Sequence, residues 1–115
     1  MDLANYQKEV TKYLGKKVNV IVDRPVGYRH HSYVYPINYG YIVELIAPDG
    51  ECQDAYLLGC KEPLKEAQGT VIAIIRREDD NEDKLVVALN GDYTDEEIEN
   101  EVHFQERFFK HKIVR

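Results

Sequence analysis

The order of the short apolar segments constrains the fold more than any other feature of the sequence. Apolar residues recur at helical spacing near the start of the chain and again after Thr94, whereas the segments between alternate with a period of two. Strands and helices do not alternate regularly, which disfavours a doubly wound parallel sheet. The order predicts a mainly β protein with flanking helices (α+β), built on a small β-barrel or a curled antiparallel sheet.

Two helices are expected, one before the strands and one after them. The first begins at Asp2, whose side chain is placed to cap it, and ends before Gly15. The second opens with the capping box of Thr94 and Glu97 and runs toward Lys110. Between the helices, alternation and turn residues predict five short strands, at about residues 18–22, 39–46, 55–58, 70–75 and 84–89, with a loop over residues 27–38.

The bulk properties limit the class of protein and its partners. The 115 residues suit one domain, over residues 1–115, and no apolar run approaches the roughly 20 residues of a membrane-spanning helix. The polar start lacks the pattern of a secretory signal, so we expect a cytoplasmic protein with no membrane partner. A formal net charge of −6 disfavours nucleic acid as a partner. An anionic ligand would need a bridging divalent cation or a local cluster of arginine and lysine.

The chain has two cysteines, Cys52 and Cys60. They could pair in principle, but small secreted domains that depend on disulfides normally carry more of them. Free thiols are therefore expected.

The string DGECQD places three carboxylates, those of Asp49, Glu51 and Asp54, on one turn that leads into a strand. Gly50 allows the backbone to bend tightly there. Oxygen ligands two residues apart can converge on one hard cation, and Mg²⁺ commonly binds through one or two carboxylates together with phosphate oxygens. The string therefore predicts a magnesium site. The same residues are also typical of an ordinary acidic hairpin turn.

Further motifs stand on both sides of this turn. In chain order they are an Asp-Arg pair at residues 23–24, YPINYGYI, the DGECQD turn, an acidic loop that ends at Lys84, and HFQERF on the last expected helix. In this combination the chain resembles a short and divergent member of the soluble (family I) inorganic pyrophosphatases, over about residues 18–110. The resemblance implies a distorted five-stranded barrel of the oligonucleotide-binding (OB) type. It also implies magnesium-dependent hydrolysis of pyrophosphate to two phosphates by a metal-activated water.

The resemblance implies roles for five acidic residues. Asp49 and Asp54 match aspartates that ligate the metals, and Glu51 stands where the family has the aspartate that assists the attacking water. Glu82 falls on a metal-binding aspartate of the second acidic loop. Asp23 takes the place of a family glutamate on the first strand, as a further metal ligand.

The resemblance also implies a set of substrate-binding groups. Arg24 and Lys84 match a phosphate-binding arginine and lysine and would stabilise the leaving phosphate. Tyr35 and Tyr39 match two tyrosines around the active site, although either could simply pack the barrel. Lys110 stands one position beyond the lysine of a phosphate-binding Tyr-Lys pair, where this chain has Phe108 and Phe109.

Three departures from the family pattern bear on activity. The chain lacks a counterpart of the family's Lys-Tyr-Glu hairpin before the Asp-Arg pair. Arg77 stands where the family has a metal-binding aspartate, and a cation there would repel one of the metals. On a continuous helix, the one-residue shift of Lys110 would turn its amine by about 100°. His30 and His31 lie in a polar loop and could reach a phosphate or a metal.

Three functions remain compatible with the sequence. The first is a magnesium-dependent inorganic diphosphatase with a small-molecule substrate. The second is a hydrolase of another phosphoanhydride or phosphoester, and the third is a non-catalytic barrel that binds metal or phosphate without turnover. Assembly into a homo-oligomer is left open.

Overall fold

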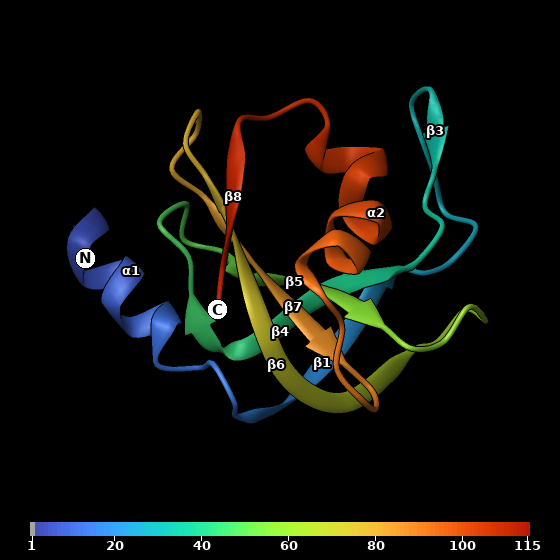
Figure 1. The fold of residues 1–115 in the computed structure, drawn as a ribbon, viewed down its shortest axis with the longest axis horizontal. Coiled ribbons are helices and arrows are strands. Elements are labelled where there is room, and N and C mark those ends of the chain that lie inside the picture. Colours follow the sequence, from blue (N-terminus) through green and yellow to red (C-terminus); the bar gives the residue numbers. More distant parts are fainter. Residues whose placement is uncertain (1) are drawn as a thin grey trace.

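The computed structural model describes residues 2–115 and contains a closed barrel of five strands. The strands pair in the order β1-β4-β5-β7-β6, and pairing between β1 and β6 closes the barrel (Figure 1). All of these pairings are antiparallel except that between β5 and β7. The barrel strands are β1 (Lys17–Arg24), β4 (Asn38–Ile46), β5 (Cys52–Leu58), β6 (Glu66–Arg77) and β7 (Asp83–Ala88). The predicted five-stranded barrel with outer helices is therefore confirmed.

Three short strands lie outside the barrel, and sequence reasoning missed all of them. β2 (Arg29–His30) and β3 (Tyr33–Val34) form a two-stranded hairpin within the expected loop, and they are too short to show a periodic pattern. β8 (His111–Val114) pairs with the end of β6. The expected strand at residues 70–75 was too short, because β6 also contains the polar residues that pair with β1.

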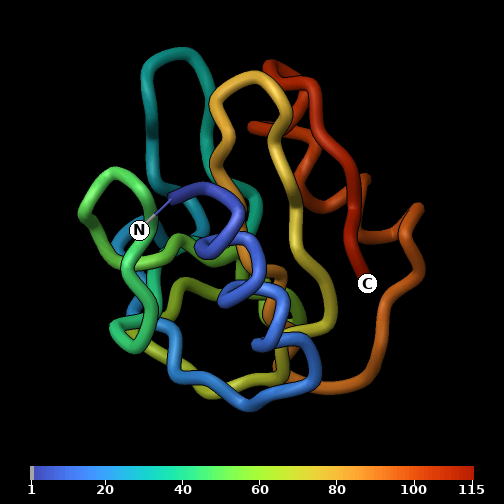
Figure 2. The backbone as a smooth tube through the Cα atoms, turned by 90° about the vertical axis from the view of Figure 1, so that its left-hand side faces the viewer, coloured from blue at the N-terminus to red at the C-terminus, as the bar shows by residue number. Residues whose placement is uncertain are grey.

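The two helices lie on different sides of the barrel (Figure 1). α1 (Leu3–Thr11) is capped by Asp2, whose Oδ1 accepts from Asn5 N at 2.9 Å. Figure 2, which looks onto the N-terminal side, shows α1 lying across the barrel. α2 (Asp95–Glu106) opens with the predicted capping box but ends at Glu106, so the expectation that it continues toward Lys110 was wrong. Neither helix of the described residues has the length and apolar character of a membrane span.

The two faces of the barrel strands bury separate apolar clusters. The inner cluster takes residues from all five barrel strands, and Tyr6 and Val10 of α1 pack into it. The Tyr6 hydroxyl donates to the buried side chain of Gln53 inside the barrel. The outer cluster lies between the strands and α2, which contributes Ile98 and Val102. β4, β5, β6 and β7 are therefore buried on both faces over part of their length, whereas β1 adds residues to the inner cluster alone.

Gly40, within the YPINYGYI motif, allows β1 and β4 to approach each other closely. An added Cβ at this position would lie 1.8 Å from the backbone oxygen of Ile21 on β1. No side chain fits there without moving the backbone of one strand. The glycine is thus required by barrel closure.

We predict that Gly40→Ala lowers the free energy of unfolding by about 3 kcal/mol or prevents folding, because the strands must separate to accept a methyl group. Gly91→Ala is the matched control. Gly91 has a φ of +69° but no atom within 4 Å of an added Cβ, so this change should cost only about 1 kcal/mol. Urea unfolding of both variants makes the comparison. Equal losses would contradict the close approach at Gly40.

Candidate active site

The candidate site begins where the outer apolar cluster ends. Residues two apart on a strand share a face, so a strand can change from apolar to charged in one step along that face. Three neighbouring strands each make this change. On the outer face, β5, β7 and β6 replace Tyr56, Val86 and Ile75 with Asp54, Lys84 and Arg77.

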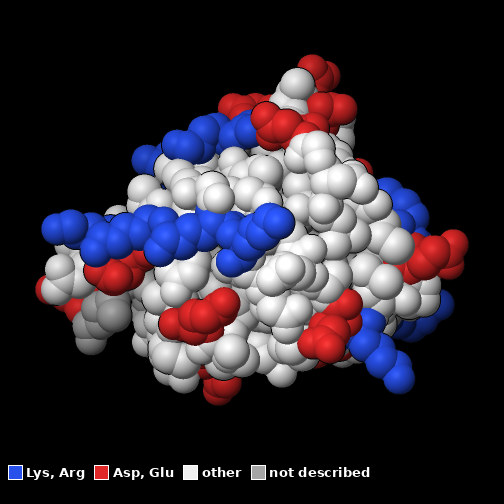
Figure 3. Space-filling view, turned by 90° about the horizontal axis from the view of Figure 1, so that it is seen from below, with Lys and Arg blue, Asp and Glu red and all other residues white. Residues whose placement is uncertain are grey.

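These charged residues line a pocket of about 300 Å³ that we call the cationic pocket. It is lined by Asp23, Arg24, His30, Tyr33, Tyr39, Asp54, Arg77, Lys84, Gln105 and Phe109. Three cationic side chains thus face one small space together with two carboxylates. The formal net charge of −6 conceals this arrangement. Figure 3 shows that Lys and Arg side chains also gather in a band on the face that it presents.

Lys84 is a buried cation held by two carboxylates. Its side chain is 6% exposed, and its Nζ lies 2.7 Å from Asp54 Oδ2 and 3.0 Å from Glu82 Oε2. Burial alone would lower the pKa of Lys84, but the neighbouring Tyr39 and Asp54 raise the pKa above its ordinary value. The amine therefore stays protonated and can act as a fixed positive charge.

Arg24 is held by an aromatic wall at the end of β1. Its Nη1 donates to Tyr35 Oη at 2.6 Å, and its guanidinium carbon lies 5.9 Å from the centre of the Tyr39 ring. Tyr35 is fully buried and donates in turn to Gln105 Oε1 at 2.6 Å. Tyr35 is absent from the lining of the cationic pocket, so the structure places it behind Arg24 as a support.

Tyr39 lines the pocket beside Lys84 and is almost fully buried. Burial raises the pKa of Tyr39 well above its ordinary value, so the phenol keeps its proton and its hydroxyl can donate a hydrogen bond. His30 also lines the pocket, whereas His31 does not. Desolvation and the positive charge of Arg24 lower the pKa of His30, so its imidazole adds no fixed charge near neutral pH.

A second hollow, of about 470 Å³, adjoins the first and is predominantly acidic. This acidic hollow is lined by Asp23, Tyr41, Asp49, Glu51, Cys52 and Asp54. Asp23 and Asp54 line both hollows and therefore form their common wall. Partial burial raises the pKa of Asp23, and the negative charge of Asp54 acts in the same direction. A cation at this wall would relieve that repulsion.

The turn that carries Asp49 and Glu51 has the bend expected from the sequence. Gly50 has a φ of +86°, and Asp49 Oδ1 accepts from the backbone N of Glu51 at 2.9 Å. Among residues 2–115, no three acidic, histidine or cysteine side chains lie close enough together to enclose a metal ion. The carboxylates of the turn therefore share one hollow without forming a closed cage.

Besides Tyr35, two predicted site residues lie outside both hollows. Glu82 contacts Lys84 and has its Oε2 3.7 Å from Arg77 Nη1, so it acts on the site through these cations. Lys110 is 75% exposed, and its Nζ lies 3.5 Å from Glu78 Oε2. Because α2 ends at Glu106, Lys110 follows a turn and the helical rotation expected for it does not apply.

Arg77 has partners that sequence reasoning did not identify. Its Nε and Nη2 donate to the two oxygens of Glu106 at 3.0 and 2.8 Å, and its Nη1 donates to Asp80 at 3.2 Å. Phe109 covers the guanidinium at 3.7 Å. Glu106 belongs to the last turn of α2 and is fully buried, so the helix supplies the carboxylate that compensates Arg77.

A signal for this helix contribution was present in the sequence. Ile98 and Val102 lie on the buried face of α2, and Gln105 and Glu106 continue that face at the next helical positions. Polar residues on an apolar helix face indicate buried partners. Tyr56, on the facing strand, donates to Glu106 Oε2 at 2.6 Å.

Both cysteines are free, as predicted.

Comparison with known proteins supports the resemblance seen in the motifs. No protein-family model matches the chain. The chain is 36% identical over 85 residues to an inorganic pyrophosphatase of the archaeon Saccharolobus solfataricus. This match covers 69% of the chain but only 46% of the archaeal protein, so the chain spans about half the length of that relative.

Solved structures extend the comparison to the fold. The inorganic pyrophosphatase of Helicobacter pylori aligns with a TM-score of 0.68, at 15% identity, over 86% of this chain and 84% of that one. The enzyme of Ehrlichia chaffeensis gives a TM-score of 0.66, also at 15% identity, over 86% and 85% of the two chains. The chain has the fold of the soluble inorganic pyrophosphatases. At 15% identity this likeness shows the fold alone. The charged pocket is therefore described from the residues of this chain.

We predict that Arg77→Asp destabilises the protein by about 3–5 kcal/mol, because it leaves the buried Glu106 without its cation and adds a second carboxylate beside it. The double change Arg77→Gln with Glu106→Gln removes both charges and should cost clearly less. Urea unfolding at neutral pH measures both. A loss below about 1 kcal/mol for Arg77→Asp would show that the pair is not the anchor described.

Proposed function

We propose that the chain hydrolyses inorganic pyrophosphate to two phosphates with the aid of a divalent cation, which we take to be Mg²⁺. The observation that carries the proposal is the shared wall of Asp23 and Asp54 between the cationic pocket and the acidic hollow. Such a wall suits an anion held by arginine and lysine on one side and a cation held by carboxylates on the other. The pyrophosphatase fold and the archaeal relative support the same function.

The donor chemistry of the acidic hollow fits magnesium. Its carboxylates come from Asp23, Asp49, Glu51 and Asp54, and all are hard oxygen ligands. Mg²⁺ keeps several waters and commonly uses only one or two carboxylates together with phosphate oxygens, so a closed protein cage is not required. In our proposal Asp54 and Asp23 are the first ligands and Asp49 is a further one. When bound, the ion lowers the pKa of a coordinated water and neutralises charge on the phosphoryl oxygens.

The residues of the chain then supply binding, orientation and proton transfer. Arg24 and Lys84 hold phosphate oxygens, because both cations line the pocket and both are fixed by buried or partly buried partners. The Tyr39 hydroxyl donates a hydrogen bond to a phosphate oxygen. Glu51 accepts the proton of the attacking water from the acidic side. Glu82 keeps Lys84 in place through the contact at 3.0 Å.

The second candidate function is hydrolysis of another phosphoanhydride or phosphoester. It is favoured by the position of Lys110 outside the pocket and by Phe109 on the pocket wall, which leave fewer cations for a bare pyrophosphate. A barrel that binds metal or phosphate without turnover is the third candidate. In each case the partner is a small molecule. A cytoplasmic location remains a prediction, and the oligomeric state stays open.

Phosphate release distinguishes the candidates. The purified protein is incubated with pyrophosphate, tripolyphosphate or nucleoside triphosphates, each with Mg²⁺ and with EDTA. Magnesium-dependent release from pyrophosphate supports the first function, and release from another substrate alone supports the second. No release from any substrate, with phosphate still bound, would leave only the non-catalytic barrel.

In the same assay, Asp54→Asn should lower turnover by about 100-fold or more, because the change keeps the shape of the side chain but removes a metal-binding charge from the shared wall. Asp92→Asn is the matched control. Asp92 is 76% exposed, pairs with Arg115 and lines neither hollow, so its loss should leave turnover unchanged. Retained turnover in Asp54→Asn would remove Asp54 from the site.

A further inference from the structure

We infer that Arg77 is an anion-binding residue, and that with Arg24 and Lys84 it allows the pocket to hold a phosphate group before any divalent cation is bound. The inference rests on the proposed function for the class of ligand, an inorganic phosphate or a phosphoanhydride. It adds a binding residue at a position where the family resemblance implies a metal-binding carboxylate.

The position of Arg77 on β6 directs its side chain into the cationic pocket. It is the last residue of β6, and its backbone N donates to Glu82 O at 2.8 Å, which keeps the strand end paired. Ile75 and Arg77 share the outer face of β6, whereas Arg76 points to the opposite face and pairs with Asp83. The Arg77 side chain is 6% exposed, and what remains accessible lies along the pocket.

The guanidinium of Arg77 has hydrogen-bonding capacity left for a ligand. An arginine side chain has five N–H donors in a fixed fork. Within residues 2–115, three hydrogen bonds use these donors, two to Glu106 and one to Asp80. Two N–H groups thus remain without a hydrogen-bond partner in this part of the chain. A planar fork with free donors suits the oxygens of a phosphate group.

A chain of hydrogen bonds fixes Arg77 relative to Arg24. Arg77 donates to Glu106, which also accepts from Tyr56 Oη at 2.6 Å. Gln105 Nε2 donates to Tyr56 Oη at 2.8 Å. Gln105 Oε1 accepts in turn from the Tyr35 hydroxyl, and the Tyr35 oxygen accepts from Arg24, which completes the series of hydrogen bonds.

The donors and acceptors of this hydrogen-bond series match at every step, and its two tyrosines are buried. The hydroxyls of Tyr35 and Tyr56 each donate once and accept once along it, and both residues are fully buried. No buried side-chain nitrogen or oxygen among the described residues lacks a partner. Buried networks in which every member is satisfied hold their groups rigidly. The two guanidinium groups are therefore held at a fixed separation by the last turn of α2.

Three carboxylates lie near Arg77, those of Glu106, Asp80 and Glu82, and none of them lines the pocket. Glu106, its main partner, is fully buried and does not line the pocket. Asp80 pairs with Arg77 from the loop after β6 and is also absent from the pocket lining. The pocket side of Arg77 adjoins Lys84, whose pKa the guanidinium acts to lower. Two adjacent cations in a space of about 300 Å³ favour an anion between them.

The test measures anion binding without hydrolysis. Inorganic phosphate is titrated into the full chain in EDTA by isothermal calorimetry, with ³¹P line broadening as a second measurement. The variant is the double change Arg77→Gln with Glu106→Gln, which removes the cation without leaving a buried charge alone. A far-UV and near-UV spectrum equal to that of the unchanged protein confirms that the variant is folded.

We expect the unchanged protein to bind phosphate in EDTA and the double variant to bind it at least 10-fold more weakly. Arg77→Lys, which keeps the charge but not the fork, should give an intermediate affinity. Lys112→Gln is the matched control for charge, because Lys112 is an exposed residue of β8 that lines neither hollow, and its affinity should stay within twofold.

Two results would overturn the inference. One is equal phosphate affinity in the double variant and the unchanged protein, which would make Arg77 a structural ion pair only. The other is the absence of phosphate binding by the unchanged protein in EDTA. Neither depends on turnover. A protein that binds phosphate through Arg77 but releases none from pyrophosphate would contradict the proposed function and leave the inference intact.

Discussion

The alternation of side chains along the barrel strands determines both the core and the candidate site. On β5, β6 and β7 one face fills the barrel and the other packs beneath α2. The register of the three strands brings their charged outer positions together, because Lys84 on β7 pairs with Ile75 on β6 and Arg77 follows only two residues further along β6. A shift of one residue in any strand would bury a charge in the barrel and carry an apolar side chain into the pocket. The site is therefore as strongly specified as the core.

The burial of the charges makes their partners essential. Taking Lys84, Arg77 or Glu106 out of water is costly unless an opposite charge and hydrogen bonds accompany it. Asp54 and Glu82 do this for Lys84, and the last turn of α2 does it for Arg77. The same partners hold the cations in fixed positions beside the acidic hollow.

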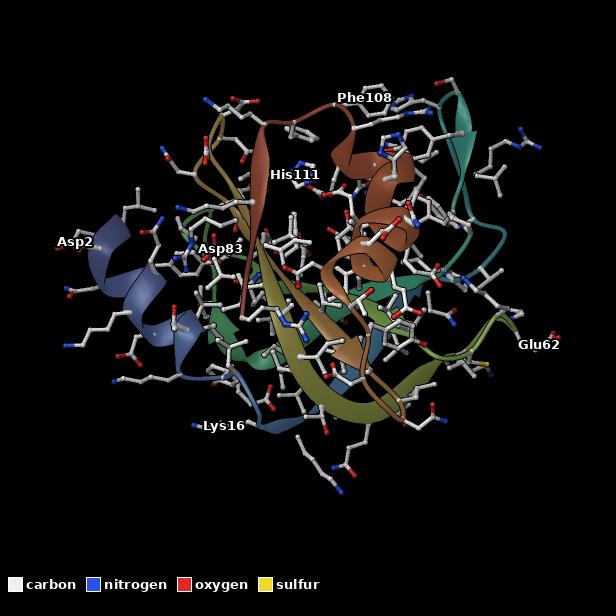
Figure 4. The ribbon with its side chains drawn as sticks, viewed as in Figure 1. Asp2, Lys16, Glu62, Asp83, Phe108 and His111 are labelled. Carbon is white, nitrogen blue, oxygen red and sulfur yellow. The ribbon has the colours of Figure 1, made fainter. Side chains whose placement is uncertain are left out.

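Figure 4 shows Phe108, just beyond α2, close to the β2–β3 hairpin, and its ring centre lies 5.9 Å from that of Tyr33. α2 and the hairpin thus contact each other beside the site, and His30, Tyr33 and Gln105 from these elements line the cationic pocket.

Much of this arrangement was predictable from local patterns. The Asp2 cap, the capping box at Thr94, the barrel strands and the acidic turn at Asp49 all depend on residues close together in the sequence. Glu106 and Gln105 were missed because their partners, Arg77 and Tyr56, are 29 and 49 residues away and only the packing of α2 brings them together. β8 was missed because the expected helix ran through the turn before it. Lys110 was misplaced for the same reason.

The most direct test of the account is a crystal structure of the protein with Mn²⁺ and pyrophosphate, with the metal located by its anomalous scattering. The account predicts a metal peak at about 2.0–2.3 Å from oxygens of Asp54 and Asp23, with phosphate oxygens on Arg24 and Lys84. A metal bound elsewhere, with Asp54 still paired only to Lys84 and no phosphate in the cationic pocket, would contradict it.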